Sequence, residues 1–72
     1  MKPEQIKALR NYMGWTQARL ALRLGVQLAT VSRWECDTKH PGVTNRRKLR
    51  GLAKRAGFTF TEEVNHGNAS PS

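Results

Sequence analysis

Cysteine, acidic residues and long hydrophobic runs are all scarce in this 72-residue chain, and each shortage excludes a class of protein. The single cysteine, Cys36, excludes an internal disulfide. No stretch approaches the roughly 18 apolar residues of a membrane span, and the first residues lack the apolar run of a signal peptide. We therefore expect a cytoplasmic protein that has no disulfide and crosses no membrane.

The shortage of acidic residues leaves the chain strongly basic. Five Asp and Glu stand against thirteen Lys and Arg, which gives a formal net charge of +8 with the two His neutral. This charge favours an anionic partner such as nucleic acid or an acidic membrane surface. A chain of this length buries only about 60% of its unfolded surface, so we expect one small core and no room for a large catalytic cleft.

Apolar residues recur at helical spacing in four segments that are separated by glycine or proline. The expected helices cover residues 3–13, 17–24, 27–35 and about 45–56. Thr16 and Thr44 are suited to cap the second and fourth of them. Residues 58–61 fit either a short strand or the lead into a weak helix over 62–65.

The interruption between the second and third segments carries the main structural signal. In GWTQARLALRLGVQLATVSRWE, residues 14–35, the glycine at 25 can adopt the positive φ of a tight turn, and small Ala21 allows two helices to approach. This predicts a helix-turn-helix. A helical wheel places Gln27, Val31 and Trp34 on the inward side of the third segment. It places Leu28, Ala29, Ser32 and Arg33 on the outward side.

Over residues 5–57 the chain resembles the phage-repressor and Cro-like (XRE) helix-turn-helix family. The matching segments are LR at 9–10, TQARLALRLGV at 16–26 and TVSRWE at 30–35. The resemblance implies an all-α fold, a compact bundle of four to five helices like that of lambda repressor. Residues 1–64 would form the DNA-binding domain and residues 65–72 a disordered tail.

The function implied by this resemblance is transcriptional regulation, as a repressor that binds double-stranded DNA sequence-specifically without a cofactor. The segment 27–35 would lie in the major groove. The residues expected to contact bases are Gln27, Leu28, Ala29, Ser32 and Arg33. Those expected to contact phosphates are Gln17, Arg19, Thr30, Lys39, His40, Arg46 and Arg47.

An ion pair and a loop residue concern the structure of the domain and not its contacts with DNA. The resemblance implies that Arg10, on the apolar stripe of the first helix, pairs with Glu35 at the end of the third, since a charge facing a core needs a partner. Where the family usually has glycine two residues later, this chain has Asp37, which adopts a left-handed conformation less readily. The geometry of the following loop is therefore left open.

Other classes of protein are weighed on the same residues. A closed zinc site needs four ligands, and only Cys36, His40 and His66 are available, so we expect no metal site. No nucleophile, base and acid occur at a spacing that catalysis could use, so we do not expect an enzyme. The alternative function is an antitoxin or protein-interaction module whose DNA binding is secondary or absent. A weak homodimer could pair on a palindromic operator. Phe58, Phe60 and Val64 would either form its small interface or cap the core.

Overall fold

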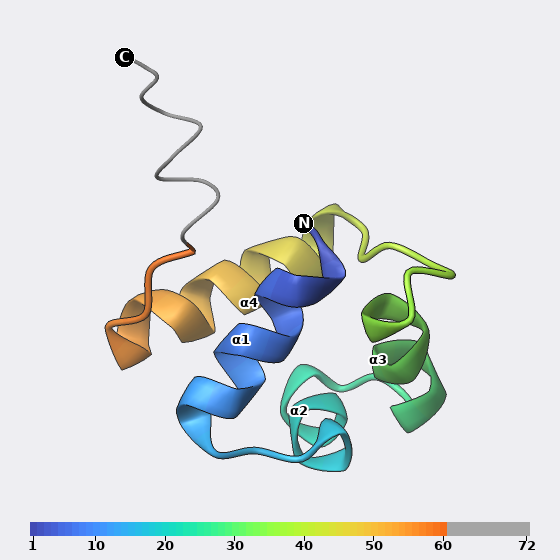
Figure 1. Ribbon diagram of the computed structural model, residues 1–72, viewed down its shortest axis with the longest axis horizontal. Coiled ribbons are helices and arrows are strands. Elements are labelled where there is room, and N and C mark those ends of the chain that lie inside the picture. Colours follow the sequence, from blue (N-terminus) through green and yellow to red (C-terminus); the bar gives the residue numbers. More distant parts are fainter. Residues whose placement is uncertain (61–72) are drawn as a thin grey trace.

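The computed structural model describes residues 1–60, in which all regular structure is helical (Figure 1). The helices are α1 (Pro3–Met13), α2 (Gln17–Leu24), α3 (Leu28–Glu35) and α4 (Val43–Ala56). α1 packs against α3 and α4, and α2 contacts the same two helices. The all-α helix-turn-helix bundle predicted from the sequence is confirmed. The helix considered over 62–65 and the tail over 65–72 lie outside the described residues.

Every helix contributes to a single hydrophobic core. Its buried side chains are Ile6, Leu9, Leu20, Ala21, Leu24, Val31, Trp34, Leu49, Leu52, Ala53 and Phe60. Trp34 is the largest of the fully buried side chains and fixes α3 against the rest of the bundle. Within residues 1–60 no helix combines the length and apolar character needed to cross a membrane.

The turn between α2 and α3 forms as the sequence predicts. Gly25 has φ +75°, and the following backbone N–H of Val26 donates to the carbonyl of Ala21 at 3.0 Å. A side chain at this φ is strained even where space is open, because Cβ then approaches the neighbouring carbonyl oxygen. Thr16 caps α2 as expected, since its side chain accepts a hydrogen bond from Arg19 N at 3.1 Å.

Two local predictions are wrong. Thr44 does not cap the fourth helix, because the helix begins earlier, after the N-cap residue Gly42. The carbonyl of Gly42 accepts a hydrogen bond from Arg46 N at 2.9 Å, and the preceding Pro41 is buried. Gln27 does not face inward; it precedes α3 in extended backbone, where a helical wheel does not apply, and its side chain is exposed. Of the two alternatives left open for residues 58–61, the strand is absent over the described residues 58–60.

The loop after α3 resolves the question raised by Asp37. This residue adopts φ +62° and is the one non-glycine residue with positive φ among residues 1–60. Thr38 N donates to the carbonyl of Arg33 at 3.0 Å and Asp37 N to that of Trp34 at 3.3 Å. These two bonds close the end of α3 in the pattern that glycine usually provides. Aspartate therefore takes the left-handed position directly.

Candidate nucleic-acid interface

The outward face of α3 is largely open to solvent, as the wheel predicts for this side. Leu28 is 51% exposed, and Ala29 and Arg33 are also exposed. Thr30 and Ser32 lie half-buried at the edges of this face. An exposed leucine and arginine on one short helix supply an apolar contact and a forked donor, the two kinds of group that read base edges.

The opposite side of α3 is held by the core and by an ion pair. Val31 and Trp34 are buried, and the carboxylate of Glu35 accepts two hydrogen bonds from Arg10. Arg10 Nε lies 2.7 Å from Glu35 Oε2, and the exposed fractions of the two side chains are 17% and 2%. The structure thus contains the pair implied by the family resemblance.

The electrostatics of Glu35 follow from this geometry. Burial alone would raise the pKa of the carboxyl group, but hydrogen bonds from Arg10 and Gln17, with the positive charges of Arg10 and Lys7, outweigh it. The pKa of Glu35 is therefore lowered. The hydrogen bond between Arg10 and Glu35 also raises the pKa of Arg10. Both shifts favour the charged forms of the two side chains, and the ion pair anchors the end of α3.

Gln17, at the start of α2, is positioned by this ion pair. Its Nε2 donates to Glu35 Oε1 at 3.0 Å, so the amide is oriented rather than free in solvent. An amide nitrogen carries two hydrogens, and one hydrogen remains for a second acceptor. Gln17 is half-buried at a helix N-terminus, where the backbone dipole favours an anion.

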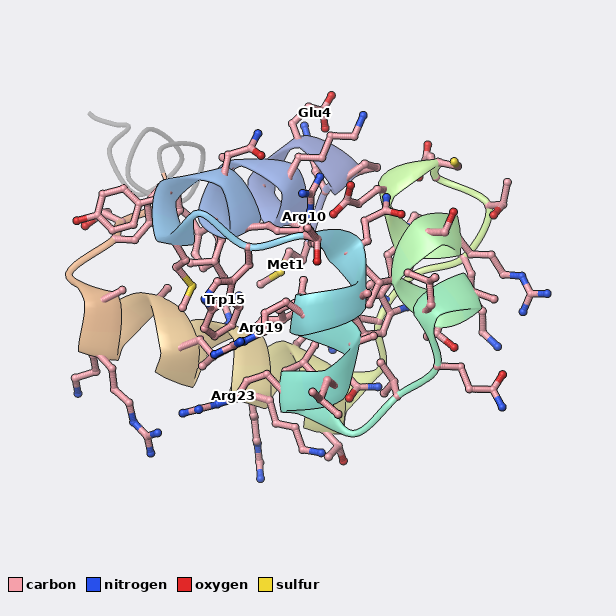
Figure 2. All side chains as sticks on the ribbon, turned by 90° about the horizontal axis from the view of Figure 1, so that it is seen from below. Met1, Glu4, Arg10, Trp15, Arg19 and Arg23 are labelled. Carbon is pink, nitrogen blue, oxygen red and sulfur yellow. The ribbon has the colours of Figure 1, made fainter. Side chains whose placement is uncertain are left out.

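Arg19 lies apart from the outward face of α3. Its guanidinium carbon is 5.6 Å from the centroid of the Trp15 ring, within range of a cation–π contact. Figure 2 shows Arg19 and Arg23 extending from α2 on the side of α4, away from α3. Arg19, one of the expected phosphate contacts, therefore lies on the α4 side of α2 and not beside the outward face of α3.

The remaining expected phosphate contacts lie in the loop after α3 and on the first turns of α4. Lys39, His40 and Arg47 are exposed. Arg46 is half-buried, and its Nε is buried without a hydrogen-bond partner in the described part of the chain. No acidic residue occurs in the first turn of α4, so this end of the helix is electropositive both from its dipole and from its side chains.

One polar contact between helices was not foreseen. Lys48 Nζ donates to the carbonyl of Leu24 at 3.0 Å and so satisfies an acceptor at the end of α2. Nothing in the spacing of the two residues, 24 apart, signals this bond. It ties the helix-turn-helix to α4 beside the turn.

A comparison with known proteins identifies the family. A family model described as helix-turn-helix matches residues 6–49, more than half of the chain, from α1 into α4. No curated protein and no solved structure matches the chain. The matched family is one of DNA-binding regulatory domains and is not an enzyme family. The chain belongs to the XRE-type helix-turn-helix family and is a DNA-binding transcription regulator.

Proposed function

We propose that this protein is a repressor that binds a specific double-stranded DNA sequence with the outward face of α3 in the major groove. The observation that carries the proposal is the exposure of Leu28, Ala29 and Arg33 on a helix whose other side is anchored by Trp34 and Glu35. Because the helix is already held in place, its backbone does not have to be ordered when the side chains contact base edges.

The proposed base contacts differ in how much sequence information they carry. Arg33 donates to O6 and N7 of a guanine, a bidentate contact worth about 1–3 kcal/mol against a wrong base. Leu28 and Ala29 contact thymine methyl groups. Ser32 and Gln27 add hydrogen bonds at the edges of the face. The Ser32 hydroxyl can accept a hydrogen bond from one base or donate one to another, and it therefore discriminates little between base pairs.

The proposed phosphate contacts fix the register of α3 on the duplex. Gln17 uses its second amide hydrogen, and Thr30, Lys39, His40, Arg46 and Arg47 supply the others. Arg46 and Arg47 stand on the first turns of α4, where no acidic side chain offsets the helix dipole, and this supports their place in the group. The position of Arg19 over Trp15 does not support a phosphate contact there, and we leave Arg19 out of the proposed interface.

We extend the proposal to assembly. One recognition helix covers too few base pairs to select a site in a genome, and helix-turn-helix proteins commonly bind two half-sites about one helical turn apart. Two copies would therefore pair on a palindromic operator. Repression then follows from occupation of that operator.

Selection from random double-stranded DNA at fixed salt tests the proposal. We expect an enriched motif whose affinity falls steeply between low and physiological salt, with a log–log slope of about −0.9 per neutralised phosphate. A reporter gene with the enriched motif in its promoter should be expressed less when the protein is present. Failure to enrich any motif would contradict sequence-specific binding, and increased expression would contradict repression.

A further inference from the structure

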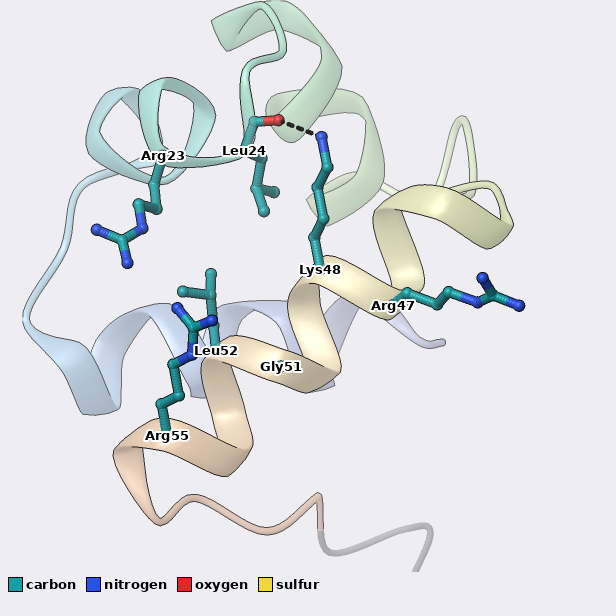
Figure 3. A pocket seen from close by; sticks show the side chains of 7 residues that line it. All are labelled: Arg23, Leu24, Arg47, Lys48, Gly51, Leu52 and Arg55. Atoms are coloured by element: carbon teal, nitrogen blue, oxygen red, sulfur yellow. Dashed lines mark hydrogen bonds between the residues drawn. The ribbon is translucent and has the colours of Figure 1, made fainter.

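A pocket with a volume of about 350 Å³ lies between α2 and α4, on the side of the bundle where Lys48 contacts Leu24 (Figure 3). Its lining residues are Arg23, Leu24, Arg47, Lys48, Gly51, Leu52 and Arg55. The volume falls within the range of pockets that hold small molecules. Leu24 and Leu52 form an apolar floor, and Gly51 leaves the wall of α4 without a side chain.

The rim of this pocket concentrates positive charge without a counter-charge. The guanidinium groups of Arg23 and Arg55 approach the same space from α2 and α4 (Figure 3). Neither forms a hydrogen bond or an ion pair with another residue among 1–60, and no acidic residue lines the pocket. Two converging like charges repel each other, and an anion between them would turn that repulsion into attraction.

The pocket shares one residue, Arg47, with the surface that we propose for DNA. None of the proposed base-contacting residues lines it. Arg47, which we assign to a phosphate, borders the pocket but extends away from Arg23 and Arg55 (Figure 3). The apolar floor is also unlike a phosphate-backbone contact, since Leu24 and Leu52 offer nothing to a phosphate group.

We propose that this pocket binds a small organic anion, a carboxylate or phosphate attached to an apolar body. The anionic group lies between Arg23 and Arg55, and the apolar body covers Leu24 and Leu52. Such a ligand joins α2 to α4 and makes this protein a regulator with a small-molecule site inside its helix-turn-helix domain. The proposed ligand contacts, Arg23, Leu24, Leu52 and Arg55, are not among the residues that we propose for DNA, so the inference stands independently of the proposed function.

Titration of the full chain with phenyl phosphate at constant ionic strength tests the proposal, followed by amide chemical shifts in ¹H–¹⁵N spectra. We expect shifts centred on Leu24, Gly51, Leu52 and Arg55, and a Kd of about 1 mM or tighter. Inorganic phosphate and phenol should each bind at least about tenfold more weakly, because each supplies one half of the contact. Equal binding of inorganic phosphate would overturn the proposed apolar contact.

Matched variants locate the site. Arg23→Gln and Arg55→Gln should each raise the Kd for phenyl phosphate about tenfold, the loss of one charge-assisted hydrogen bond. Lys54→Gln removes the same charge from α4 but does not line the pocket, and it should leave the Kd within about twofold. Equal weakening by all three changes would show a general charge effect and overturn the site.

Two further measurements exclude other occupants. The slope of log affinity for DNA against log salt concentration should be the same for Arg23→Gln, Arg55→Gln and Lys54→Gln. A slope reduced by about 0.9 in the two arginine variants alone would assign these side chains to DNA phosphates instead. Changing both Glu62 and Glu63 to Gln should leave the Kd for phenyl phosphate unchanged within about twofold. A Kd tightened about tenfold would show that carboxylates of the chain itself compete for the pocket, and would overturn the proposal.

Discussion

Arg10 on α1 and Glu35 on α3 are joined by two hydrogen bonds, Nε to Oε2 at 2.7 Å and Nη2 to Oε1 at 3.0 Å. The remaining nitrogen of the same guanidinium, Nη1, donates a hydrogen bond to the carbonyl of Trp15 at 2.9 Å. One side chain therefore connects α1, the start of the helix-turn-helix and the end of the helix that we propose for base recognition. Gln17 shares the carboxylate, which couples this anchor to a proposed phosphate contact.

Breaking this pair should destabilise the fold strongly. Arg10→Ala leaves the Glu35 carboxylate buried without its main partner, and we expect a loss of about 3 kcal/mol in the free energy of unfolding, measured by urea denaturation. The double variant Arg10→Met with Glu35→Leu removes both charges and should recover most of that loss. A double variant no more stable than Arg10→Ala would contradict this account of the pair.

The lowered pKa of Glu35 predicts a pH dependence of stability. Folding favours the ionised carboxylate, so its contribution is fully present above the unfolded pKa of about 4.3 and is lost as pH falls through the lower folded pKa. The difference in Tm between the wild type and Glu35→Gln should be constant from about pH 6 to 8 and should shrink below about pH 4. A difference that persists unchanged at pH 3 would show that the carboxylate charge is not the stabilising feature.

Asp37 offers a stabilising substitution. Asp37→Gly removes the strain of a left-handed aspartate at φ +62°, and we expect about 0.5–1 kcal/mol of added stability, seen as a Tm several degrees higher. The contact that is lost is small, since His40 Nε2 is 3.8 Å from Asp37 Oδ1 and both side chains are well exposed. As the reverse control, Gly25→Ala should cost about 1 kcal/mol, because a Cβ there meets open space and only the backbone is strained. A lower Tm for Asp37→Gly would contradict the claim that the left-handed backbone of Asp37 is strained.

The position of Phe60 bears on assembly. Phe60 is 5% exposed and packs edge-on against Phe58, with ring centroids 5.4 Å apart, so it belongs to the core of its own chain. Within residues 1–60, the apolar groups that remain accessible at this end are half-buried Phe58 and the exposed ring of Tyr12 beside it. We predict a monomer or weak dimer in sedimentation of the free protein, and pairing on a palindrome but not on a single half-site. A dimer that persists at nanomolar concentration without DNA would place the interface elsewhere.

The order of the helices and the turn could be predicted because the signals are local. Gly25 follows an apolar stripe at helical spacing, and positive φ at that point is a property of one residue and its neighbours. The Arg10–Glu35 pair came only from the family resemblance, since no local rule relates residues 25 apart. The start of α4 was misplaced because Thr44 is a favourable cap residue by type, whereas the helix begins directly after Gly42, next to the buried Pro41.

The pocket and the division of the basic residues were beyond sequence reasoning. Arg23 and Arg55 belong to separate helices, and only packing brings them to one rim. Arg19 looks equivalent to the other basic residues in the sequence, yet it lies over Trp15 on the α4 side. Charge identifies a partner class, but the fold decides which charges share a surface.

The most direct test of the account compares Arg33→Ala and Arg47→Ala on the selected duplex and on a duplex altered at one base pair of the motif, each over a range of salt concentrations. Arg33→Ala should lose about 1–3 kcal/mol of discrimination at that base pair, whereas Arg47→Ala should weaken both duplexes equally and reduce the salt slope by about one. The same loss of discrimination from both variants, or from neither, would contradict the placement of α3 in the major groove.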